Sequence, residues 1–133
     1  MAQASPNRKA RPLSPHLQIW RWGPGMLTSI LHRATGNALA FAGIGTLLCW
    51  LGSLASGPEA YAKFLAVASS WYGLVVLIVI SWSFFNHLVS GLRHLVLDVG
   101  AGFELDTNNR WAALSPVIGV VFTALFWAAI LHH

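Results

Sequence analysis

The amino-acid sequence predicts an all-α membrane protein with three transmembrane helices. Only 9% of the 133 residues are charged, whereas 56% are hydrophobic, and a soluble domain has about 25% charged residues. Three stretches contain no Lys, Arg, Asp or Glu: Ala34–Pro58, Phe64–Leu92 and Trp111–His133. Because a helix needs about 20 apolar residues to cross a bilayer, each stretch is long enough for one span, and no room remains for a large soluble domain.

Proline and glycine residues set the boundaries that we expect for these helices. The first helix should end before the Ser–Gly–Pro run at 56–58, which interrupts a helix. The second should end at Gly100 and Gly102, and its first turns, up to about Ser70, are expected at the membrane interface. Residues 27–133 then form a three-helix anchor, with helices over 27–55, 64–98 and 111–131 and short connections over 59–63 and 103–110.

Residues 1–26 are expected to form a cytoplasmic N-terminal segment, since they are polar and basic and contain no apolar stretch of signal-peptide type. Cationic side chains are concentrated on one side of the predicted helices. Arg8, Lys9, Arg11, Arg21, Arg33, Arg93 and Arg110 fall on the side of the N-terminus, and only Lys63 falls on the other.

This asymmetry predicts the orientation in the membrane. Cytoplasmic loops carry the excess of Lys and Arg, so the N-terminus is expected in the cytoplasm or the matrix. The short N-terminal segment favours the bacterial inner (cytoplasmic) membrane over the mitochondrial inner membrane. Because the charges lie at the helix ends, beside membrane lipid, the net charge of +4 is no sign of a nucleic-acid partner.

The second predicted helix carries one polar stripe. His87 lies deep in the uncharged stretch, where an ionisable side chain is a functional-site hypothesis by default. Gly91, His94 and Asp98 follow at four, seven and eleven residues, which places them on the same helix face. Gly91 leaves space beside the imidazole for a large planar ligand. Alternatively, His87 makes only an interhelical hydrogen bond, His94 is an interface anchor, and Asp98 pairs with Arg93 or caps the loop.

Imidazole is the usual protein ligand of haem iron, so His87 is a candidate axial ligand of haem b. Arg93 lies about 9 Å nearer the membrane surface at 1.5 Å per residue, and Arg33 is expected in the same leaflet, so basic groups are available for the two propionates. A six-coordinate haem needs two axial ligands, and His87 is the only deep histidine. The second ligand should therefore come from another chain, which makes this one half of a heterodimeric haem-binding bundle.

The start of the first helix carries a second candidate site. Ser29 and Arg33 are four residues apart and share a helix face, as do His32 and Gly36. A hydroxyl and a guanidinium side by side can hold a carbonyl or a carboxylate at the membrane edge. The alternative is that His32 and Arg33 are anchors that extend toward the headgroups.

Three sequence blocks together resemble the cytochrome b membrane-anchor subunit of succinate dehydrogenase, respiratory complex II. They are residues 11–17 (RPLSPHL), 29–36 (SILHRATG) and 87–98 (HLVSGLRHLVLD). Their order, spacing and three-helix setting match that family over most of the chain from Arg11. The third helix matches in hydropathy only, and Trp20 stands where the family often has tyrosine.

The resemblance implies roles for individual residues. The counterpart of His87 is an axial ligand of haem b, and a sister anchor subunit supplies the other ligand. The counterparts of His32, Arg33 and His94 lie near the haem propionates. Residues matching Ser29 and Arg33 line the ubiquinone site, with the position of Asp98 in the polar region near the quinone. With Gly91 from the spacing argument, these are the predicted cofactor-binding and quinone-binding residues, and no residue is predicted to be catalytic in the strict sense.

The resemblance also implies an activity and partners. The chain would be an anchor subunit of succinate:ubiquinone oxidoreductase, an enzyme of the respiratory chain and the tricarboxylic acid cycle. A flavoprotein subunit and an iron–sulfur subunit would carry the dicarboxylate chemistry. Ser29 would hydrogen-bond a quinone carbonyl, and Arg33 would favour the negative charge that develops as the quinone is reduced.

Three other functions remain open from the residues. The same architecture could anchor a quinol:fumarate reductase, because the sequence does not determine redox potentials. It could be a haem-free structural membrane anchor, in which His87 only hydrogen-bonds. A small transporter or channel subunit would be expected to have broken helices or charges near the midplane, which the first two predicted spans lack apart from His87.

Overall fold

The computed structural model describes residues 14–16, 19 and 21–132, and these contain helices and no strand. In chain order the elements are α1 (Pro24–Ala38), the π-helical turn η1 (Leu39–Gly43), α2 (Ile44–Ala55), α3 (Pro58–Ala68), α4 (Trp71–Asp98) and α5 (Leu105–His132). Three helices are long and apolar enough to cross a membrane: Pro24–Ala55, Trp71–Asp98 and Leu105–His132. The prediction of an all-α membrane protein with three spans is therefore confirmed.

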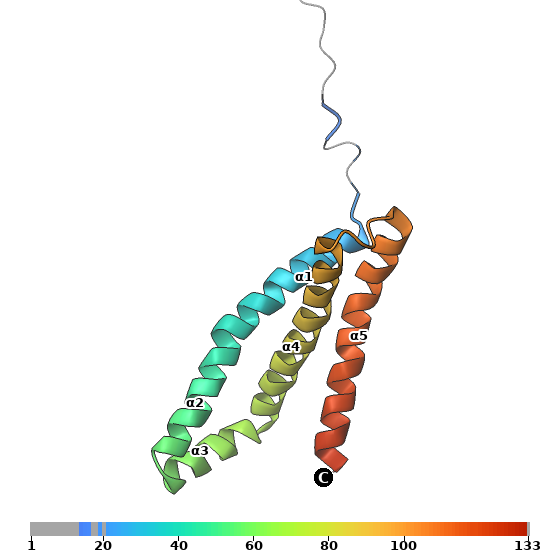
Figure 1. The fold of residues 1–133 in the computed structure, drawn as a ribbon. Helices are drawn as coiled ribbons and strands as arrows, with labels where there is room; N and C mark the ends of the chain where they lie inside the picture. Colours follow the sequence, from blue (N-terminus) through green and yellow to red (C-terminus); the bar gives the residue numbers. More distant parts are fainter. Residues whose placement is uncertain (1–13, 17–18, 20, 133) are drawn as a thin grey trace, which may run out of the picture.

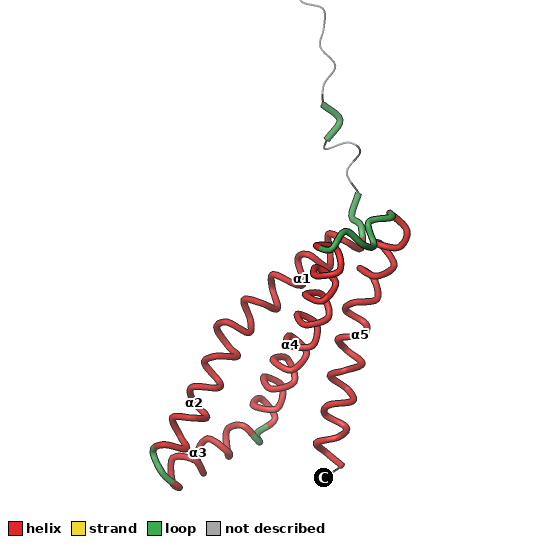
Figure 2. The backbone as a smooth tube through the Cα atoms, in the orientation of Figure 1, coloured by secondary structure: helices red, strands yellow, loops and turns green. Residues whose placement is uncertain are grey.

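The three long helices meet at one end of the molecule. The start of α1, the end of α4 and the start of α5 lie together there, and α5 runs alongside α4 (Figure 1). Toward the other end, α2 diverges from α4 and contacts α3 but, among the described elements, neither α4 nor α5. The tube in Figure 2 shows α3 as a short helix between the far ends of α2 and α4.

The second predicted helix is in fact two helices, which corrects the expected range of 64–98. Gly57 adopts φ 101°, which suits glycine, and Pro58 starts α3 at once, so the connection expected over 59–63 is helical. The chain then breaks at Ser69–Ser70. The Ser70 hydroxyl caps α4 by accepting the Gly73 amide at 3.2 Å, and a Cβ at Gly73 would lie 2.1 Å from the Val67 carbonyl oxygen.

The third helix begins at Leu105, six residues before the predicted start at Trp111. The Asn108 amide donates to the Glu104 carbonyl at 2.8 Å and closes the first turn, and Asp106 is favourably placed in that turn beside the positive end of the helix dipole. The polar residues over 105–110 were expected to form a loop, but they belong to the helix and form the part of it that extends beyond the apolar stretch. The first helix likewise begins at Pro24, earlier than the predicted residue 27.

Small and polar residues make up the interior of the bundle. The buried side chains on α4 are Ser83, Asn86 and Ser90, and those on α5 are Ala112, Ser115 and Thr123. Large apolar side chains point outward along all three spans. The arrangement is the reverse of that in a soluble protein, whose core is made of large apolar side chains. It is typical of membrane helices, because burying an apolar side chain gives no hydrophobic gain when the surroundings are lipid, and small residues let the helices pack closely.

Candidate functional site

His87 lies on α4 with its ring half-buried against α1. Its Nδ1 lies 3.0 Å from the backbone carbonyl oxygen of His32. Because a carbonyl oxygen only accepts, the hydrogen resides on Nδ1, and Nε2 keeps its lone pair. Among the described residues Nε2 has no hydrogen-bond partner. The His87 ring is thus held in the tautomer that a metal ligand through Nε2 requires.

His32 stacks directly on His87. The two ring centroids are 4.0 Å apart and the planes differ by 8°. The His32 Nδ1 lies 2.7 Å from the Ser90 hydroxyl oxygen, and that hydroxyl donates to the Asn86 carbonyl oxygen, also at 2.7 Å. With the single hydroxyl hydrogen in that bond, His32 Nδ1 is the donor to Ser90. Ser90 therefore fixes the tilt of His32, and His32 fixes His87.

His94 completes what we call the histidine cluster, which is His32, His87 and His94. Its ring meets His32 edge-on, with centroids 4.9 Å apart and planes at 71°. The three rings stack and tilt and do not converge on one point. Within the part of the chain that the structure describes, no group of three or more His, Cys, Asp or Glu could hold a metal ion. The cluster is therefore no site for a bare metal ion.

Two glycines allow the rings to approach the helices. A Cβ at Gly36 on α1 would lie 2.8 Å from the His87 Cε1, closer than side-chain atoms approach. A Cβ at Gly91 would lie 3.8 Å from the His32 Cε1, an ordinary contact. Gly36 makes the room for the His87 ring, whereas Gly91 faces His32.

Ser29 and Arg33 lie together on α1, as their spacing predicts. The Arg33 Nη2 donates to the Ser29 hydroxyl oxygen at 3.2 Å. Arg33 is exposed and Ser29 is half-buried, so a ligand can reach the pair from outside the chain. A hydroxyl that accepts from a guanidinium retains its own hydrogen for a ligand carbonyl.

Arg93 does not lie above the histidine cluster, which corrects the expectation that it caps the imidazole of His87. Its Nη2 donates to the Asn108 Oδ1 on α5 at 2.6 Å. Six residues at 100° each turn the helix by about 600°, which leaves the Arg93 side chain about 120° around the axis from that of His87 and directed toward α5. Counting residues gives depth along the helix and not direction around it.

Asp98, the last residue of α4, is exposed. It pairs with no cation among the described residues, whose one ion pair joins Lys63 and Glu59, so the alternative of an Asp98–Arg93 pair is not found. Arg8, Lys9, Arg11 and most of the 11–17 block lie outside the described residues.

The sequence did not predict the roles of Ser90 and Asn108. The role of Ser90 was predictable, because it follows His87 by three residues and so shares its helix face. Nothing in the sequence indicated the contact of Asn108 with Arg93, since that contact depends on where α5 begins.

Comparison with known proteins relates these features to one family. A family model described as succinate dehydrogenase/fumarate reductase transmembrane subunit matches residues 7–130. The succinate dehydrogenase cytochrome b556 subunit of Paracoccus denitrificans is 44% identical over 128 residues, which cover 93% of this chain and 98% of the relative. The cytochrome b556 subunit of Rickettsia felis is 36% identical, over 88% of this chain and 90% of that protein.

A mitochondrial relative is more distant. The succinate dehydrogenase cytochrome b560 subunit of Sus scrofa is 34% identical over 119 residues, which cover 86% of this chain and 66% of the pig protein. The likeness therefore extends over all three spans and includes both candidate sites.

Proposed function

The chain belongs to the family of succinate dehydrogenase/fumarate reductase transmembrane subunits, and from this premise we propose that it shares one haem b with a sister anchor subunit and forms part of a ubiquinone-reduction site. Membrane anchorage itself follows from the three spans and the family. The observation that carries the proposal is the His87 Nδ1–His32 carbonyl hydrogen bond, because it leaves Nε2 free as a ligand.

The residues present fit a haem. Gly36 leaves the room against α1 that the His87 ring occupies, since a Cβ there would lie 2.8 Å from the His87 Cε1, and the His87 Nε2 has no hydrogen-bond partner among the described residues. The relatives are named as cytochrome b subunits. His87 would be the axial ligand, with His32, Arg33, Gly91 and His94 around the macrocycle and its propionates. When bound, haem b supplies a one-electron redox centre.

His32 is not suited to be the second axial ligand of the same iron. Two imidazoles that hold one iron would have to direct ring nitrogens toward a common point, whereas the His32 and His87 rings lie face to face in nearly parallel planes. A histidine or other ligand from the sister anchor subunit would supply the second ligand. This agrees with the count of deep histidines in the sequence.

The Ser29–Arg33 pair is the proposed quinone contact of this chain. The Ser29 hydroxyl would donate to a quinone carbonyl oxygen, and the Arg33 guanidinium, which already holds Ser29 at 3.2 Å, would stabilise negative charge on that oxygen as it is reduced. Both side chains lie in the first three turns of α1, on the side where Asp98 ends α4. Protons would reach the quinone from that side.

Partners and location follow from the same proposal. An iron–sulfur subunit would deliver electrons to the quinone, and a flavoprotein subunit would oxidise succinate. The complex would lie in a bacterial inner membrane with the N-terminus of this chain in the cytoplasm. The relatives named above are succinate dehydrogenase subunits, which favours succinate oxidation over fumarate reduction.

A reduced-minus-oxidised visible spectrum of the purified complex tests the haem assignment. The wild type should show a b-type α band, and His87→Ala should lose it or shift to a high-spin spectrum, because an axial ligand is gone. His132→Ala, at the exposed end of α5, is the matched control and should leave the band unchanged. A normal low-spin band in His87→Ala would contradict the assignment.

Two activities measured side by side test the quinone contact. Ser29→Ala and Arg33→Leu should lower ubiquinone reduction about tenfold or more, as expected when a charge-assisted hydrogen bond is lost. Reduction of an artificial dye by the same preparations should persist, since the dye takes electrons before the quinone site. Ser53→Ala, far along the same span, should behave as wild type. Unchanged ubiquinone reduction in both Ser29→Ala and Arg33→Leu would contradict the assignment, whereas equal loss of both activities would indicate failed assembly.

A further inference from the structure

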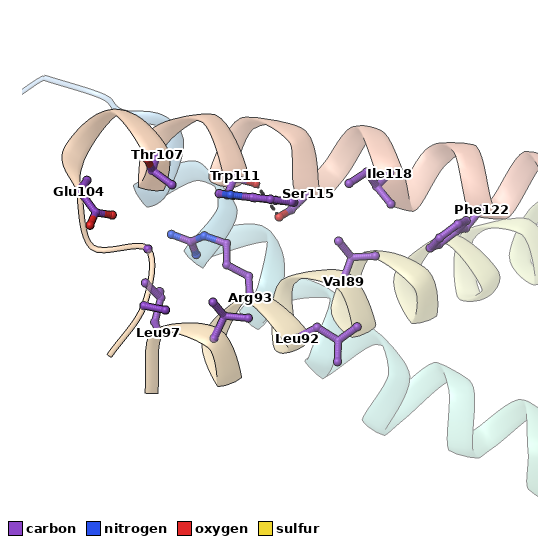
Figure 3. A pocket seen from close by; sticks show the side chains of 13 residues that line it. Val89, Leu92, Arg93, Leu97, Glu104, Thr107, Trp111, Ser115, Ile118 and Phe122 are labelled. Atoms are coloured by element: carbon purple, nitrogen blue, oxygen red, sulfur yellow. Dashed lines mark hydrogen bonds between the residues drawn. The ribbon is translucent and has the colours of Figure 1, made fainter. Parts of the chain in front are cut away.

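A groove of about 540 Å³ lies between α4 and α5 at the end where the helices meet. Its long walls are apolar and include Val89 and Leu92 on α4 and Ile118 and Phe122 on α5. Its charged lining residues, Arg93 and Glu104, lie toward the end where the chain passes from α4 to α5, which we call the mouth of the groove (Figure 3). The groove is thus apolar along its length and charged at one end.

The groove is separate from the histidine cluster. Leu92 and Arg93 emerge on the side of α4 away from His87, because their side chains lie about 140° and 120° around the helix axis from that of His87. None of the groove's lining residues belongs to the histidine cluster or to the Ser29–Arg33 pair. The groove is therefore lined by residues other than those proposed to hold the haem and the quinone.

Arg93 has unused binding capacity. Of its five N–H donors, one bonds the neutral Asn108 side chain, and its Nε is enclosed without a partner. Its charge faces no carboxylate within ion-pair distance, since the described residues contain one ion pair and it joins Lys63 and Glu59. A half-buried cation at a membrane edge without a counterion favours an anionic group from outside the chain.

Glu104 gives the mouth a second, opposite charge. It is exposed and immediately precedes α5. Figure 3 shows its carboxylate on one side of the mouth and the Arg93 guanidinium extending toward the centre. Because the two charges do not pair with each other, they match a ligand that carries an anion and a cation a short distance apart.

Dimensions and position fit a lipid. From Thr107 to Phe122 the groove follows α5 for about 22 Å at 1.5 Å per residue, which exceeds the roughly 15 Å of hydrocarbon in one leaflet. Trp111, also in the lining, is of the residue type that marks the headgroup level. The charged mouth therefore lies at headgroup depth and the apolar walls lie at acyl-chain depth.

We propose that this groove binds a zwitterionic phospholipid with an ethanolamine headgroup. The phosphate accepts from Arg93, the ammonium donates to Glu104, and one acyl chain lies along the apolar walls. A phosphocholine headgroup fits less well, because its quaternary ammonium has no N–H to donate. An anionic headgroup without an ammonium would leave Glu104 opposed to a like charge.

Native mass spectrometry of the complete, lipid-stripped complex, titrated with dioleoyl phosphatidylethanolamine, phosphatidylglycerol or phosphatidylcholine, tests this proposal. The wild type should bind the ethanolamine lipid most tightly. Arg93→Gln should weaken that binding about tenfold or more. Glu104→Gln removes only an exposed charge, so the complex stays intact, and it should abolish the preference for ethanolamine over glycerol headgroups.

Arg110→Gln and Asp106→Asn are the matched controls, because both residues are exposed at the same end of α5 and neither lines the groove. They should retain the wild-type order of affinities. Equal binding of all three lipids by the wild type, or equal effects of controls and groove variants, would overturn the proposal. So would the absence of specific binding, which is the result expected if a partner subunit fills the groove.

Discussion

At the scale of single residues, the histidine cluster depends on groups that have no ligand chemistry of their own. A backbone carbonyl, that of His32, selects the tautomer of His87, and the Ser90 hydroxyl orients His32. Gly36 contributes only the absence of a side chain. Each of these groups helps to fix the orientation of an imidazole ring. A binding site depends on such supporting groups, because they hold its ligand atoms in the geometry that binding requires.

Gly36→Ala should weaken haem retention about fivefold, because its Cβ would lie 2.8 Å from the His87 Cε1 and overpacking of this kind costs about 1 kcal/mol or more. The His87 ring cannot simply rotate away, since Nδ1 is held by the His32 carbonyl. Haem content per complex, from the pyridine haemochrome spectrum, measures the effect.

Gly45→Ala is the matched control, since a Cβ at Gly45 would meet nothing within 4 Å. It should retain haem as the wild type does. If both variants keep full haem content, the His87 ring does not depend on the space at Gly36.

At the scale of elements, α4 and α5 are joined by a seam of small residues. Gly119 on α5 packs against the backbone of Asn86, where a Cβ would lie 3.0 Å from the Asn86 Cα. The Asn86 amide is buried there without a hydrogen-bond partner in the described chain. An amide left unsatisfied costs free energy, so the close approach of the two helices must supply the compensating contacts.

Gly119→Leu should force α4 and α5 apart and lower the Tm of the complex, with a cost of about 1–3 kcal/mol from overpacking. Differential scanning fluorimetry of the purified complex measures it. Ala124→Leu, on the exposed face of the same helix, adds the same side chain without meeting α4 and should leave the Tm near that of the wild type. A similar Tm for the two variants would argue against the tight seam.

At the scale of the whole molecule, the described cations gather at one end. Arg21, Arg33, Arg93 and Arg110 belong to the end where α1 starts, α4 finishes and α5 starts, while Lys63 lies on α3 at the opposite end (Figure 1). The fold therefore collects charges that are distant in the sequence onto one side of the membrane, as the positive-inside rule requires.

Single-cysteine labelling tests the predicted orientation, in which the cationic end of the molecule lies in the cytoplasm. In a Cys49→Ser background, Ser56→Cys, between α2 and α3, should react with a membrane-impermeant maleimide in spheroplasts. Ser14→Cys, near the N-terminus, should react only in inverted vesicles, because the positive-inside rule predicts that the cationic side faces the cytoplasm. The reverse pattern of labelling would contradict the predicted topology.

The sequence by itself determined the number of spans, through its apolar runs. Residue spacing determined the shared α4 face of His87 and His94 and the pairing of Ser29 with Arg33. These properties are local, since span length depends on a run of apolar residues and a helix face depends on spacing of three or four residues. Helix ends were less predictable. The break at Ser69–Ser70 lies within an apolar run, and the first turns of α5 lie within a polar one.

Only the tertiary structure decided how residues on different helices meet. The stacking of His32 on His87, the space at Gly36 for the His87 ring and the contact between Arg93 and Asn108 join residues 15 to 55 positions apart. Depth in the membrane can be counted along a single helix, but the direction of a side chain has meaning only once a neighbouring helix is in place. For that reason the sequence predicted Arg93 above the imidazole of His87, whereas in the structure its side chain turns toward Asn108 on α5.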